Sequence, residues 1–73
     1  EVDFVAQKGT DIRYYQVSLS VMEETVLARE LAPFQKITDN FPKYLITMDT
    51  IDFSQNGIIH QNLYDFLLGK NKQ

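Results

Sequence analysis

The chain has 73 residues, of which 44% are hydrophobic and 23% charged. This is enough for one small domain, and the length excludes a second folded domain. The absence of cysteine excludes disulfides, thiol nucleophiles and cysteine-ligated metal sites. The net charge of −3 disfavours binding to nucleic acid through its phosphates, and the apolar runs are too short to cross a membrane. We therefore expect a soluble domain of a reducing compartment, the cytoplasm.

The first elements in chain order are predicted to form a β-hairpin. Residues 2–7 and 12–19 are rich in β-branched and aromatic residues, and the residues between them include Gly9 and are typical of a turn. Side chains alternate along a strand, so Asp3 and Phe4 point to opposite faces. Because a strand begins at the very first residues, we expect the chain to be a piece of a longer polypeptide. A missing neighbour strand would leave an exposed edge that can recruit a partner.

A helix over residues 21–36 and a central strand are predicted next. Ser20 and Glu23 have the spacing of a capping box, and Pro33 is expected to weaken the last turn. The apolar stripe of this helix consists of Leu27, Leu31 and Phe34. Residues 44–48 are apolar on both faces, as in a central strand of a parallel sheet. Strand, helix and strand in this order predict a right-handed parallel crossover.

The chain is predicted to end with a short strand and a short helix. Residues 58–61 form the strand, and Asn62 is placed to cap a helix that stops at Gly69. The side chains expected to face inward on this helix are Leu63, Phe66 and Leu67. We predict one domain over residues 1–69 and a disordered polar tail over residues 70–73. The predicted fold class is α/β (α+β), with a β-hairpin, a helix, a parallel strand, a short strand and a C-terminal helix.

One group of side chains has catalytic potential, namely Asp3 in the first strand with Gln16 and Ser18 in the second. Metal-dependent nucleases hold Mg²⁺ with acids on neighbouring strands and place a lysine two residues after the second acid. Gln16 and Ser18 have this spacing, but neither carries a charge. Glu1 is a weak alternative metal ligand on the same face as Asp3. We therefore predict no catalytic residue, no cofactor and no bound metal, and interpret Gln16 as a partner of backbone or hydroxyl groups.

Other polar residues lack the spacing that chemistry requires. His60 is the only histidine and cannot build a zinc site without cysteine, so we interpret it as a surface or strand-edge residue. The loop that holds Asp49 and Asp52 lacks the glycine and closing glutamate of a calcium-binding EF-hand, so we interpret it as solvated. The aromatic residues are spread over every predicted element, and core packing accounts for most of them.

Five segments carry a resemblance to a known family: EVDFV at residues 1–5, YQV at 15–17, ETVLARE at 24–30, DNFPKYLITMD at 39–49 and GIIHQNLYDFLL at 57–68. In this order they resemble the C-terminal domain of unknown function behind the P-loop module of prokaryotic AAA-type ATPases. The resemblance implies a restriction-endonuclease-like fold of the PD-(D/E)XK superfamily, whose core runs helix, strand, strand, strand, helix, strand. This chain would begin at the second core strand. By position, Asp3 would match the metal-binding aspartate, while Gln16 and Ser18 depart from the second acid and the lysine.

Three hypotheses for function follow. The first is a non-catalytic accessory or interaction domain of a AAA-type ATP-binding protein, with a nuclease-like fold and a degraded active site. The second is a metal-dependent nuclease in which Glu1 and Asp3 hold Mg²⁺ and Lys36 or Lys43 replaces the missing lysine. The third is a self-association module that pairs through an exposed sheet edge. The expected partners are the rest of its own ATPase chain or a second copy, with no nucleic acid and no membrane.

Overall fold

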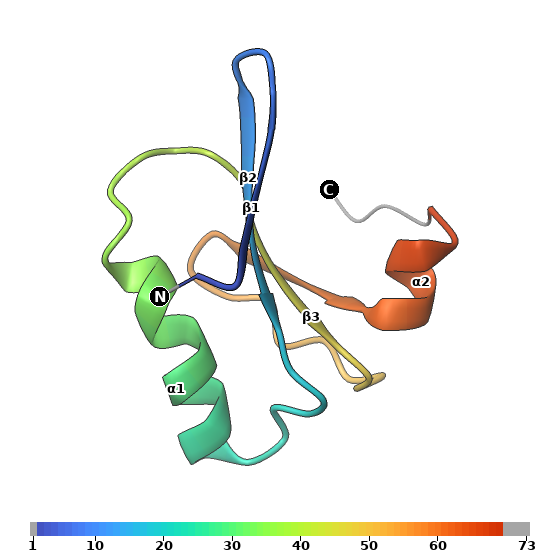
Figure 1. Ribbon diagram of the computed structural model, residues 1–73. Helices are drawn as coiled ribbons and strands as arrows, with labels where there is room; N and C mark the ends of the chain where they lie inside the picture. The colour runs from blue at the N-terminus through green and yellow to red at the C-terminus, as the bar shows by residue number, and fades with distance from the viewer. Residues whose placement is uncertain (1, 70–73) are drawn as a thin grey trace.

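A four-stranded mixed sheet is the centre of the structure, a computed structural model that describes residues 2–69 (Figure 1). The elements are β1 (Phe4–Lys8), β2 (Asp11–Val17), α1 (Glu24–Gln35), β3 (Lys43–Thr47), β4 (Ile58–Asn62) and α2 (Leu63–Leu67). The strands lie in the order β1-β2-β3-β4, with β1 antiparallel to β2 and the other neighbours parallel. The predicted α+β class, the hairpin and the parallel pairing of β2 with β3 are confirmed.

The hairpin of β1 and β2 turns over Gly9 and Thr10. Lys8 pairs with Asp11 on either side of these residues, and Gly9 has a φ of 62°. A positive φ costs glycine little because it has no Cβ, and hairpin turns of this length need one. The tip of the hairpin projects beyond the rest of the sheet (Figure 1).

The core lies between the sheet and α1. The buried apolar residues that form it are Val21, Leu31, Phe34, Leu45 and Ile58. Leu27 is half-buried and packs against this cluster, so the predicted apolar stripe of α1 is confirmed. Burying side chains of this size stabilises the fold by about 1.5–3 kcal/mol each. We call the sheet face under α1 the helix face and the opposite one the open face.

The predicted start of α1 is wrong. The helix begins at Glu24, and Glu23 at the N-cap makes no side-chain hydrogen bond to the first turn. Ser20 lies three residues before this N-cap; its hydroxyl donates to Asp49 Oδ1 at 2.7 Å and accepts the N–H of Met22 at 3.3 Å. Pro33 lies inside the helix, which ends two residues later at Gln35.

The other side of the sheet carries α2, so the two helices lie on opposite sides (Figure 1). Phe66 contacts the Tyr15 ring edge-on at 5.7 Å, and Tyr15 stacks on Tyr44 at 5.2 Å. The prediction that Leu67 faces inward is wrong, because it is 68% exposed. No further layer covers α2 among residues 2–69, so only the side of α2 toward Tyr15 is packed.

The ends of α2 match the prediction. The side chain of Asn62 accepts hydrogen bonds from the N–H groups of Tyr64 and Asp65, and Gly69 stops the helix with a φ of 75°. The tail predicted over residues 70–73 lies outside the described residues. No helix within residues 2–69 has the length and apolar character needed to span a membrane.

Candidate functional site

The structure brings Asp3 and Gln16 together at the point where the chain enters β1. The N–H of Asp3 donates to Gln16 Oε1 at 2.6 Å, and Asp3 Oδ2 accepts the N–H of Val17 at 2.9 Å. The other end of the Gln16 amide donates to the carbonyl of Glu30 on α1 at 3.1 Å. Gln16 is 4% exposed, so its amide joins the hairpin to the helix inside the domain. The interpretation of Gln16 as a backbone partner is confirmed.

Ser18 does not join this pair. Its hydroxyl donates to the carbonyl of Ser20 at 3.2 Å, which fixes the segment between β2 and α1. The other candidate ligand, Glu1, lies outside the described residues. Within residues 2–69, no three histidine or acidic side chains are grouped so that they could hold a metal ion.

A second polar cluster, which the sequence did not indicate, is buried between β3, β4 and the loops that follow β2 and β3. Its buried members are His60, Thr47 and Asp49, and the exposed Ser20 bonds to it from the loop after β2. We interpreted His60 as a surface or strand-edge residue: β4 does lie at an edge of the described sheet, but a surface position is wrong, because His60 is 2% exposed. His60 alternates with Ile58 along β4 and therefore shares the helix face with a core residue. This alternation along β4 is the sequence signal that could have predicted the burial of His60.

The hydrogen bonds of this cluster fix the tautomer of His60. The N–H of Phe53 points at His60 Nδ1 at 3.0 Å, so Nδ1 accepts and carries no proton. His60 Nε2 therefore carries the proton and donates to Thr47 Oγ1 at 2.7 Å. The Thr47 hydroxyl donates in turn to Asp49 Oδ2 at 3.0 Å and accepts the N–H of Asp49.

Asp49 ends this chain of hydrogen bonds as a buried carboxylate, and the prediction that it lies in a solvated loop is wrong. It is 8% exposed and accepts hydrogen bonds from the Val21 N–H at 2.8 Å and from Ser20 and Thr47. Burial by itself raises the pKa of Asp49, but these three hydrogen bonds outweigh burial and lower it. The Ser20 hydroxyl donates to Asp49, whereas in a nucleophilic triad the serine hydroxyl donates to the histidine.

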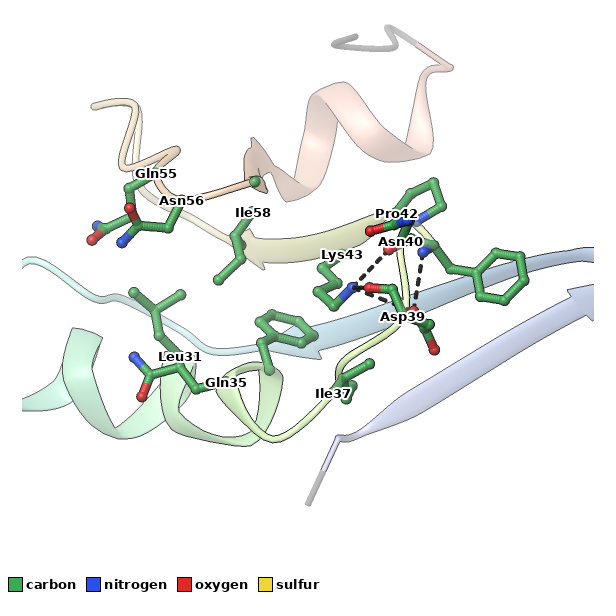
Figure 2. A pocket seen from close by; sticks show the side chains of 13 residues that line it. Leu31, Gln35, Ile37, Asp39, Asn40, Pro42, Lys43, Gln55, Asn56 and Ile58 are labelled. Atoms are coloured by element: carbon green, nitrogen blue, oxygen red, sulfur yellow. Dashed lines mark hydrogen bonds and ion pairs between the residues drawn. The ribbon is translucent and has the colours of Figure 1, made fainter.

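A cleft of about 430 Å³ opens between the end of α1 and the starts of β3 and β4 (Figure 2). The residues that line it include Leu31, Phe34, Ile37, Gln55, Asn56 and Ile58. Lys43 supplies its only positive charge among the lining residues, but Lys43 Nζ donates to the carbonyls of Asp39 at 3.0 Å and Phe41 at 2.9 Å. The pKa of Asp39 is lowered, chiefly by the hydrogen bond that its carboxylate accepts from the Tyr14 hydroxyl. Lys43 and Asp39, the charged residues that line the cleft, therefore hold the loop of residues 39–42 in place.

A groove on the open face of the sheet also measures about 430 Å³ and is lined almost wholly by apolar side chains. We call it the open-face groove; its lining includes Phe4, Tyr15, Val17, Ile46, Leu63 and Phe66. Phe4 is 61% exposed although it is a large aromatic residue. The sequence analysis assigned most aromatic residues to the core, so this exposed surface was not anticipated.

Comparisons with known proteins add no relative. No family model matches the chain, and no curated protein and no solved structure shows significant similarity to it. The functional argument therefore rests on the residues and their geometry.

Proposed function

We propose that the chain is a non-catalytic accessory domain of a AAA-type ATP-binding protein of the cytoplasm, with a nuclease-like fold, and that it works as an interaction module. The order of elements supports the fold. β1, β2, α1 and β3 follow the strand, strand, helix, strand that completes the core of the restriction-endonuclease-like fold.

The hydrogen bonds made by Asp3 and Gln16 are the observation that supports the non-catalytic part of the proposal. Both ends of the Gln16 amide and one oxygen of Asp3 bond to the protein's own groups, which join β1, β2 and α1. A magnesium site needs several oxygens free to face the ion, and a carboxylate is the ligand it prefers. Position 18, where the nuclease lysine would stand, is a serine bonded to the backbone. The residues at the nuclease positions therefore serve the fold.

The groove and the sheet edge support the interaction part. Monomeric proteins rarely leave large apolar side chains grouped on one face unless that face is used. Phe4 and Val17 are both exposed and both line the open-face groove.

The test is a titration with MgCl₂ and with MnCl₂, followed through the backbone amide NMR shifts of Asp3, Gln16 and Ser18, with cleavage of supercoiled plasmid measured in parallel. We expect no saturable shift and no nicking. An Asp3→Asn variant is the control, because it removes charge and keeps the shape of the side chain. A saturable shift at about millimolar metal or below, together with nicking that Asp3→Asn abolishes, would establish the nuclease hypothesis and overturn this proposal.

A further inference from the structure

The main chain of β1 is available for pairing on its outer side. Within the described part of the chain β1 pairs only with β2, and all five of its residues are exposed. The residues that flank a hairpin turn of this length bond to each other, so Lys8, Ala6 and Phe4 direct their main-chain groups toward β2. Val5 and Gln7 alternate with these three residues, so the main-chain N–H and C=O groups of Val5 and Gln7 point away from the sheet.

The side chains of β1 do not protect this edge. Proteins usually guard an edge strand with proline, a bulge or charged residues in the middle of the strand. β1 pairs with β2 in continuous register without a bulge, and its one charged residue, Lys8, stands at its end. Phe4 and Val5 are 61% and 58% exposed and point to opposite faces. β1 thus lies at an edge of the sheet, yet it carries large apolar side chains of the kind found in inner strands.

The charges at the two ends of this segment decide how a second strand would align. Asp3 precedes β1 and Lys8 ends it, so the segment runs from an acidic to a basic end. A second copy placed parallel would bring like charges together. An antiparallel copy brings the acidic end of one strand beside the basic end of the other, which favours this orientation.

We propose that two copies of the chain associate antiparallel through their β1 edges, which makes one continuous sheet across both copies. With Ala6 at the twofold axis, Val5 of each copy lies opposite Gln7 of the other, so their outward main-chain groups bond. The small side chain of Ala6 lets the strands approach. This inference rests on the proposed function in one respect, since it gives the interaction module its partner.

The experiment measures molar mass by sedimentation equilibrium, with the chain at concentrations from roughly 10 µM to 1 mM, because an interface of one strand per copy is small. We expect the mass to rise with concentration from 8.5 kDa toward twice that value. In Val5→Pro the outward N–H is lost while the bonds between β1 and β2 stay, so this variant should remain monomeric. Val5→Thr keeps the N–H and the branched shape, and should associate like the parent chain.

A measurement without variants guards against misfolding of Val5→Pro. In the parent chain, the amides of Val5 and Gln7 should become protected from hydrogen exchange as concentration rises, and the amide of Lys8 should not change. A monomer at every concentration would overturn the inference. So would a dimer that leaves these two amides unprotected, for example one held by the open-face groove and lost in Val17→Lys. Neither result bears on metal binding, so the inference and the non-catalytic proposal can fail separately.

Discussion

The hydroxyl of Thr47 holds the buried polar cluster together because it uses all of its hydrogen-bonding capacity. It accepts from His60 Nε2 and from the N–H of Asp49, and it donates to Asp49 Oδ2. No buried side-chain nitrogen or oxygen among the described residues lacks a partner. A buried group that loses its partner costs more than a hydrogen bond normally contributes, so the cluster depends on each member.

Thr47→Val tests this role because it removes the hydroxyl and keeps the shape. We expect a loss of about 1–3 kcal/mol in the free energy of unfolding, since three buried hydrogen bonds of the Thr47 hydroxyl, to His60 Nε2, Asp49 Oδ2 and the Asp49 N–H, are lost. Thr47→Ser keeps the hydroxyl and should lose clearly less. Urea denaturation gives both values. Long-range ¹H–¹⁵N NMR of the parent chain should show the proton of His60 on Nε2; a proton on Nδ1, or a Thr47→Val variant as stable as the parent, would contradict the arrangement.

Asp49 makes stability depend on pH in the acidic range. Its pKa is lower folded than unfolded, so its ionised form stabilises the fold. This contribution is complete above the unfolded value of about 3.9 and is lost as the pH falls through the folded pKa. Asp49→Asn should therefore be less stable than the parent chain at pH 7, and the difference should shrink as the pH is lowered below about 4. Thermal melts across this range measure it, and a difference independent of pH would refute the assignment.

The contacts of the buried polar cluster were the hardest features to predict from the sequence. Ser20 and Asp49 are 29 positions apart, so no local spacing reveals their bond. The error at the start of α1 has another cause: Glu23, and not Ser20, stands at the N-cap. Asp3 and Gln16, by contrast, were assigned to neighbouring strands of a hairpin, and the structure joins them, although Asp3 lies just before β1 and not in it.

At the scale of elements, α1 is held by one stripe of apolar side chains. Leu31 and Phe34 are buried against the sheet, while neighbouring Ala32 is exposed. Local signals were enough to predict this stripe, as they were for the Asn62 cap and the Gly69 stop. Each of those features is decided by residues within one or two turns of each other.

Leu31→Asp should unfold the domain. The change places an unpaired charge in the core, and a chain of this length has a total stability of only about 4–11 kcal/mol. Ala32→Asp is the matched control, with the same new side chain at the next position, and should cost about 1 kcal/mol or less because it faces water. Circular dichroism and thermal melts compare the two, and equal melting temperatures would mean that the buried face of α1 is wrongly placed.

At the scale of the whole molecule, the two faces of the sheet differ. α1 covers the helix face, whereas α2 covers only part of the open face and leaves the groove beside Phe4 and Val17. The hairpin and the parallel crossover from β2 to β3 could be predicted, because a strand, a helix and a strand restrict the topology, whereas the pairing of β4 with β3 was not predicted. The groove could not be predicted, because the exposure of a side chain depends on which other elements are present to cover it.

The strands follow one another across the sheet in the order in which they occur along the chain. We expect the hairpin to close first, since its strands are joined by the shortest connection, and β3 to be added only after the long crossover through α1. The bond between Ser20 and Asp49 joins the segment after β2 to the segment after β3, so both must be in place before it forms. We therefore expect it to form after the folding barrier, where the loss of an interaction speeds unfolding and leaves the folding rate nearly unchanged. Loss of this bond should shorten the lifetime of the folded domain.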